Sequence, residues 1–86
     1  MQYKGFEIEI VPSDRVIRWD KNGKMKVQNG FIIAIYADFE RTKMIEKVSV
    51  CQGYELMNNT IEEALEFAQD LIECEMKAFR EREENL

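Results

Sequence analysis

The stretch TIEEALEFAQDLIECEM, residues 60–76, decides how this chain folds, because it predicts one long helix. Thr60 and Glu63 have the spacing of a capping box, in which each side chain bonds the other residue's backbone amide. Strong helix formers follow, and the predicted helix covers residues 60–83. At about 100° per residue, one narrow apolar stripe is suited to pack on a sheet. This stripe contains Ile61, Leu65, Ala68, Ile72 and Phe79.

A second apolar row lies about 100° to one side of this stripe. The row contains Phe67, Leu71, Cys74 and Ala78. It has two interpretations. Either sheet curvature or residues 54–57 cover it, or it forms an interface with a second copy of the chain or with another protein.

The remaining helix face is acidic. It carries Glu62, Glu66, Asp70 and Glu73, with no base among them. Like charges at this spacing destabilise a helix by about 0.2–0.5 kcal/mol per pair. The row is therefore either a solubilising surface or an acidic surface that contacts a partner. Glu75 lies near the centre of the apolar arc, so it either extends past the sheet edge or pairs with Lys47 or Arg41.

The sequence before the helix predicts an antiparallel sheet of about four strands. Apolar residues alternate or run continuously at residues 3–11, 15–20, 25–28, 31–38 and 44–51. Pro12 is expected to end the first run, and Asn29-Gly30 is expected to form a turn. The fold class is then α+β, one domain over residues 1–86, with the long C-terminal helix covering one sheet face.

Asn22-Gly23 predicts a β-hairpin. A two-residue type I′ turn at this position pairs Trp19 with Lys26 and Ile17 with Gln28. The hairpin carries a basic patch, which consists of Arg15, Arg18, Lys21, Lys24 and Lys26 together with Trp19.

The basic hairpin patch also has two interpretations. It can follow phosphates and stack a base, or its charges protect an exposed strand edge while Trp19 packs beneath Lys26. The net charge of −5 argues against a dedicated nucleic-acid binder, because such domains are basic as a whole. Direct nucleic-acid binding is therefore not expected.

The residues that most enzymes use are missing from the sequence. There is no histidine, which removes the usual general base near neutral pH and the commonest metal ligand. Cys51 and Cys74 form no CxxC pair, and no glycine belongs to a phosphate-binding motif. We therefore predict no enzyme activity, no cofactor and no metal. The sequence shows no signal peptide and no apolar span of about 20 residues, which predicts a cytoplasmic protein with no membrane contact.

Charge is divided along the chain. Residues 1–54 carry nine bases and seven acids, and residues 55–86 carry three bases and ten acids. We expect a small, acidic, non-enzymatic protein–protein interaction module, with a homodimer as one form of that interaction and the partner's identity left open.

The alternative function is an inhibitor that blocks a nucleic-acid-binding protein through its acidic helix face. A row of carboxylates can compete for a groove that holds phosphates. In size and charge the chain is similar to small acidic anti-restriction and anti-CRISPR proteins of phages and mobile elements. That likeness is one of composition alone.

Overall fold

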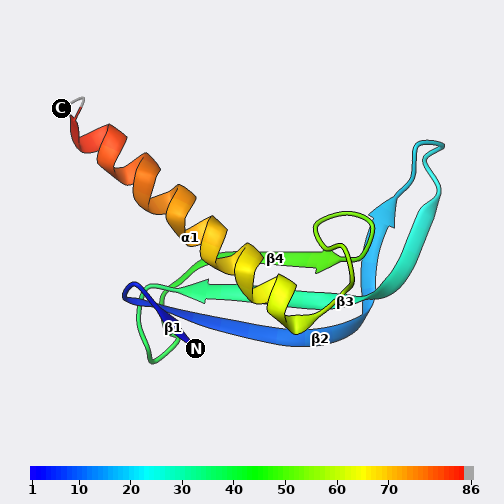
Figure 1. Cartoon of the computed structure of the whole chain (residues 1–86), viewed down its shortest axis with the longest axis horizontal. Coiled ribbons are helices and arrows are strands. Elements are labelled where there is room, and N and C mark those ends of the chain that lie inside the picture. The colour runs from blue at the N-terminus through cyan, green and yellow to red at the C-terminus, as the bar shows by residue number, and fades with distance from the viewer. Residues whose placement is uncertain (85–86) are drawn as a thin grey trace.

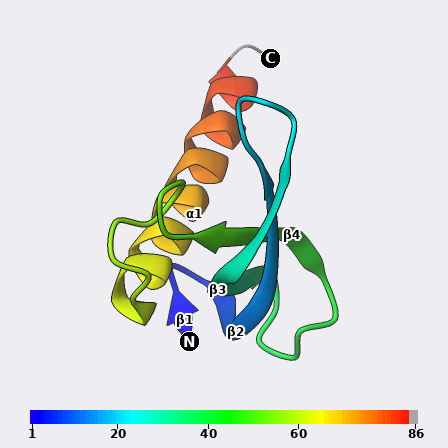
Figure 2. The same ribbon diagram turned by 90° about the vertical axis from the view of Figure 1, so that its right-hand side faces the viewer.

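A computed structural model of the protein describes the backbone of residues 1–84 and the side chains of residues 1–78 (Figure 1). The elements are β1 (Gln2–Tyr3), β2 (Phe6–Trp19), β3 (Met25–Tyr36), β4 (Met44–Cys51) and α1 (Ile61–Glu84). The strands form one antiparallel sheet in the order β1-β2-β3-β4. Helix α1 crosses one face of this sheet, as the two views show (Figures 1 and 2). The predicted α+β fold is confirmed.

The core lies between α1 and the sheet face that α1 covers. Side chains alternate along a strand, so the odd-numbered residues of β3 share this face. Two alanines of α1 are completely buried, which lets the helix backbone lie close to the sheet. The buried cluster consists of Ile8, Phe31, Ile33, Ile35, Val50, Leu56, Ala64, Ala68 and Ile72.

The predicted breaks at Pro12 and Asn29-Gly30 are wrong, because β2 and β3 continue through them. Pro12 is tolerated because β2 has lost its β1 neighbour there, so within the described chain this edge needs no amide donor. Gly30 is needed for space. A Cβ atom on Gly30 would lie 2.1 Å from the Val50 carbonyl oxygen and 2.9 Å from Cys51 Cβ. Its role is close strand packing, and no turn forms there.

The Asn22-Gly23 hairpin is confirmed, but its predicted turn type and register are wrong. Trp19 pairs with Met25, and Ile17 pairs with Val27. The Gly23 amide donates to the Asp20 carbonyl oxygen (3.1 Å), and Gly23 alone among the loop residues has a positive φ. This is the three-residue loop with a bulge glycine. The Asp20 carboxylate accepts bonds from the amides of Asn22 (2.9 Å) and Lys24 (2.8 Å), which favours the longer loop.

A tight turn divides the first predicted strand. Lys4 and Gly5 both have positive φ (48° and 88°), and Tyr3 pairs with Phe6 across them. Positive φ at both central residues is the geometry of a type I′ turn. The predicted strand at residues 3–11 is thus corrected to a two-residue β1 followed by β2.

The predicted capping box at the start of α1 is confirmed. The Glu63 amide donates to the Thr60 hydroxyl (3.2 Å), and the Thr60 amide donates to the Glu63 carboxylate (3.4 Å). That carboxylate also accepts from the amides of Met57 (2.8 Å) and Asn58 (2.7 Å). Glu63 therefore holds the 57–60 segment as well as the helix end. These amide donors, Met57 first, lower the pKa of the Glu63 carboxyl below its usual value.

Replacing Glu63 by glutamine should reduce stability at pH 7 and flatten its acid dependence. A carboxyl whose pKa is lowered on folding stabilises the fold above its unfolded pKa, and that contribution is lost as pH falls through the folded value. The urea midpoints of wild type and Glu63→Gln should therefore differ at pH 7 and converge below about pH 4. Glu62→Gln, at the adjacent exposed position, is the control. A difference between the two urea midpoints that stayed the same at low pH would contradict this explanation.

The predicted helix stripe is partly correct. Ala68 and Ile72 are buried, and Leu65 packs against the core at its margin. Ile61 is the exception, because its side chain is 51% exposed and lines an open groove beside β2. Burial of α1 begins at Ala64, one turn farther along, and continues through Ala68 and Ile72. The side chain of Phe79 lies outside the described residues.

A β-bulge bends the β2–β3 ribbon where it leaves the sheet. Ser13 pairs with Gly30 and Val16 pairs with Gln28, so Asp14 and Arg15 both lie opposite Asn29. Such a bulge bends a ribbon and increases its twist. Residues 16–28, here called the arm, turn away from the sheet and rise on the side from which α1 also projects (Figures 1 and 2).

Candidate interaction surfaces

One face of the arm is apolar and open to solvent. Paired residues of an antiparallel ribbon share a face, and the four residues in question form two such pairs. Their exposed fractions are Ile17 49%, Trp19 65%, Met25 56% and Val27 52%. We call them the outer face of the arm. Because the odd residues of β3 share one side, this face continues the sheet face that α1 covers farther along.

The opposite face of the arm is attached to the rest of the molecule. Arg18 donates to the Ser49 carbonyl oxygen, forms an ion pair with Glu55 and lies over the Tyr54 ring at 5.5 Å. Gln28 donates to the Gln52 carbonyl oxygen (2.8 Å). These contacts fix the arm's direction, and they leave its outer face pointing away from the 49–55 segment.

The structure divides the predicted basic hairpin patch. Arg18 is directed inward to Glu55, whereas Arg15, Lys21, Lys24 and Lys26 are exposed. The expected packing of Trp19 beneath Lys26 is wrong, because Trp19 is 65% exposed and the corrected register pairs Lys26 with Arg18. The same ribbon therefore carries exposed bases and an apolar face that the sequence analysis did not predict. Asp20, which forces the longer loop, was the signal that could have revealed it.

The acidic row of α1 is also divided. Glu73 accepts a hydrogen bond from the Tyr3 hydroxyl (2.8 Å) and forms an ion pair with Lys4, so it connects the helix to the β1 turn. The Tyr3 pKa is raised, mainly by this hydrogen bond to Glu73. Glu62, Glu66 and Asp70 are exposed and form no ion pair with the side chains that the structure describes.

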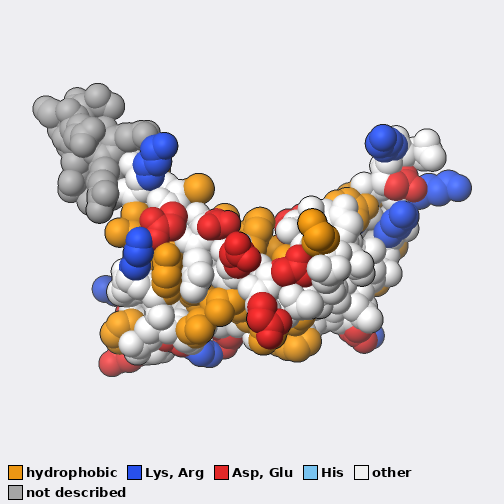
Figure 3. Space-filling model, in the orientation of Figure 1, with side chains coloured by type: hydrophobic (Ala, Val, Ile, Leu, Met, Phe, Trp, Pro, Cys, Tyr) orange, Lys and Arg blue, Asp and Glu red, His pale blue; other side chains and the backbone are white. Residues whose placement is uncertain are grey.

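A hollow beside α1 brings carboxylates of the helix together with Glu55 of the preceding loop. It is lined by Glu55, Glu63, Glu66, Phe67 and Asp70. Two of these acids already have partners, because Glu55 pairs with Arg18 and Glu63 caps the helix. Acidic side chains cross the middle of this side of the molecule, and basic ones gather on the arm (Figure 3). The acidic side chains therefore lie over the body of the molecule, and these basic ones project with the arm (Figure 3).

The second apolar row of α1 borders this hollow. Phe67 and Leu71 are half-buried and pack against the core cluster. Cys74 is exposed and Ala78 is half-buried, since α1 extends past the sheet toward its C-terminal end (Figure 1). The row is thus covered by the sheet at one end and open at the other.

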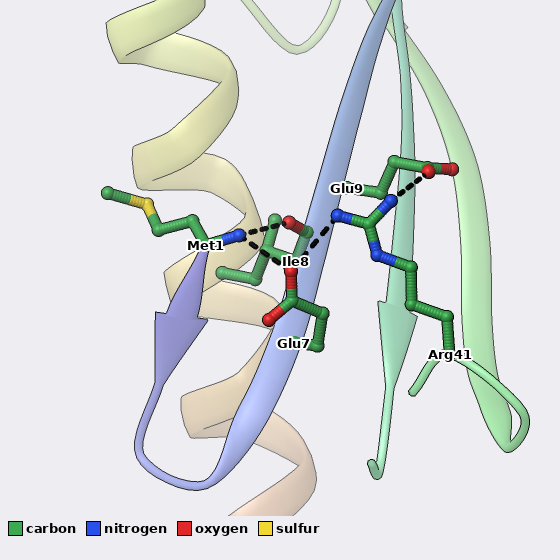
Figure 4. A network of polar contacts seen from close by, with 5 residues as sticks. All are labelled: Met1, Glu7, Ile8, Glu9 and Arg41. Atoms are coloured by element: carbon green, nitrogen blue, oxygen red, sulfur yellow. Dashed lines mark hydrogen bonds and ion pairs between the residues drawn. The ribbon is translucent and has the colours of Figure 1, made fainter. Parts of the chain in front are cut away.

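The two predicted partners of Glu75 are placed elsewhere. Glu75 is exposed and forms no ion pair within the described part of the chain, which agrees with its position past the sheet edge. Arg41 instead pairs with Glu7 (3.0 Å) and Glu9 (Figure 4). Glu7 also accepts from the Met1 ammonium group (2.8 Å), and its pKa is lowered by that bond and by Arg41.

The side chains that the structure describes include no group of three or more Cys, Asp and Glu that is placed to hold a metal ion. No helix within the described residues has the length and apolar character needed to cross a membrane. Comparison of the chain with protein-family models, with curated proteins and with solved structures finds no match.

Proposed function

We propose that the protein is a non-enzymatic protein–protein interaction module and that the outer face of its arm contacts the partner. The observation that carries this proposal is the apolar quartet Ile17, Trp19, Met25 and Val27, each about half exposed or more. Folded monomers seldom leave a contiguous apolar surface open unless it binds something. A two-stranded ribbon is also only marginally stable by itself, so the arm gains from being covered.

The exposed bases around this face add selectivity. Lys21 and Lys24 lie in the loop at the end of the arm, where this face ends. A partner that covers the apolar face therefore brings acidic groups to its rim, because rim charges guide association and exclude wrong partners.

The proposal is tested by comparing three forms of the protein as affinity baits. Ile17→Ser with Val27→Ser removes half of the quartet, and Phe39→Ser with Ile45→Ser is the matched control at exposed apolar positions elsewhere. Circular dichroism should show that all three are folded. Proteins retained by wild type and control should be lost from the arm variant. Equal retention by the arm variant would overturn the proposal.

The acidic face of α1 supports the second candidate function, an inhibitor that occupies a phosphate-binding groove. Glu62, Glu66 and Asp70 are the exposed members of the row, since Glu73 is held by Tyr3 and Lys4. Three carboxylates replace only a few phosphate contacts, because duplex DNA carries one charge per about 1.7 Å of axis. In the same bait experiment, Glu66→Lys with Asp70→Lys should lose the partner if this face binds it.

A further inference from the structure

The arm and α1 each have an uncovered surface, and that of the arm continues the sheet face that α1 covers. Within the sheet, α1 lies over the odd-numbered residues of β3, namely Phe31, Ile33 and Ile35. Val27 and Met25 continue that face on the arm, where no helix of the described chain covers them. At its C-terminal end, α1 extends past the sheet and exposes Cys74 (Figure 1).

The two uncovered surfaces have opposite charge. The arm exposes the bases Lys21, Lys24 and Lys26, and α1 exposes the acids Glu62, Glu66 and Asp70. The ion pairs that the structure describes join none of the arm's bases to an acid of α1, and the arm and α1 rise from opposite ends of the sheet (Figure 1). The attraction between them is therefore left for a contact between two molecules.

The shape of the molecule fits the same arrangement. Its radius of gyration is 14.7 Å, whereas a compact domain of this length has one of about 12 Å. The difference comes from projections at both ends of a 44 Å long molecule. Exchange of such a projection between two copies is a low-cost route to a dimer.

We propose that the occupant of the outer face is a second copy of this chain. The arm of each copy lies on the exposed flank of α1 of the other, with Ile17, Trp19 and Val27 against the row Leu71, Cys74 and Ala78. Lys21 and Lys24 then reach Glu66 and Asp70 of the second copy. Because each copy gives an arm and receives one, the contact occurs twice and the assembly closes as a two-fold dimer.

The required area is a small share of the surface of the chain. A stable dimer buries about 800 Å² per partner, which is about one eighth of the 6340 Å² surface of this chain. Each copy contributes two patches, its arm and its helix flank, of about 400 Å² apiece. This inference rests on the proposed function, since it identifies the partner that covers the same face.

The first test uses the wild-type chain. Trp19 is the sole tryptophan, so its fluorescence reports directly on the arm. Between low and high micromolar protein, light scattering should change from the monomer mass to twice that mass, and the emission should shift to the blue in parallel. A monomer mass at high micromolar concentration overturns the dimer. If the arm variant then still loses a different captured protein, the interaction function stands without the dimer.

The second test reverses charge on one surface at a time. Lys21→Glu with Lys24→Glu makes an acidic arm, and Glu66→Lys with Asp70→Lys makes a basic helix flank. Each variant alone should dimerise at least about tenfold more weakly, because both of its contacts bring like charges together. Mixed in equal amounts, the two variants should form a heterodimer of near wild-type affinity, since both contacts are then complementary.

The control for the mixture is Lys43→Glu with Lys47→Glu, at exposed positions in and just before β4. It should dimerise like wild type. When mixed with the acidic-arm variant, it should form a heterodimer no more tightly than wild type does with that variant. If the two charge variants remain folded by circular dichroism but form no heterodimer when mixed, the proposed contact between arm and helix is wrong.

Discussion

Replacing Gly30 by alanine is expected to destabilise the protein by about 3 kcal/mol or more, near the upper end for a single substitution. An added Cβ would lie 2.1 Å from the Val50 carbonyl oxygen, 2.9 Å from Cys51 Cβ and 2.9 Å from Val16 Cγ2. The nearest of these atoms belongs to the backbone of β4, so no side-chain rotation removes the clash. Strands β3 and β4 would have to separate where the arm begins.

The matched control is Asn29→Ala, because Asn29 is exposed and adjacent on the same strand. Its free energy of unfolding in urea should stay within about 0.5 kcal/mol of wild type. A Gly30→Ala protein with nearly wild-type stability would contradict the close packing of β3 against β4. Total stability for a chain of this size is only about 4–13 kcal/mol, so Gly30→Val should prevent folding at 37 °C.

Replacing Ile72 by alanine is expected to cost about 2–5 kcal/mol. The Ile72 side chain is 1% exposed and lies in the cluster between α1 and the sheet. Truncation removes buried methyl and methylene groups and leaves a cavity that the rigid sheet below cannot fill. The same measurement on Ile61→Ala, at a position that is 51% exposed, should give less than about 1 kcal/mol. The reverse order would mean that another helix face is buried.

The helix and the fold class were predictable because their signals are local. The capping box needs two residues three positions apart, and both of its bonds are present. The apolar period of α1 correctly predicted that Ala68 and Ile72 are buried, and it was wrong for Ile61, one turn before the first buried residue. The exposure of Ile61 was not predictable, since it depends on where the sheet lies beneath the helix start.

The arm was less predictable, because its faces depend on two backbone irregularities. Asp20 sets a longer hairpin loop than Asn22-Gly23 suggests, and that shifts every later pair by one residue. The bulge at Asp14 and Arg15 then moves the core-side positions of β2 from even to odd numbers. Simple alternation read through residues 6–19 therefore puts Trp19 on the wrong side.

The candidate surfaces were also predictable where their signals are local and unpredictable where they depend on distant contacts. The acidic and basic residues were identified from composition and spacing, and their positions on α1 and the hairpin agree with that reading. The ion pairs that bind Arg18 to Glu55 and Glu73 to Lys4 join residues 37 and 69 positions apart. Contacts between residues so far apart in the sequence depend on the complete fold, so no local sequence pattern predicts them.

The bulge also has an evolutionary consequence. Asp14 and Arg15 are exposed, and neither side chain is needed to make the ribbon bend. The bend requires that two residues stand opposite one, whatever those residues are. Selection on this segment should therefore preserve its length while its side chains drift. A deletion of one residue here would straighten the ribbon and redirect the arm, although every residue of the outer face remained in place.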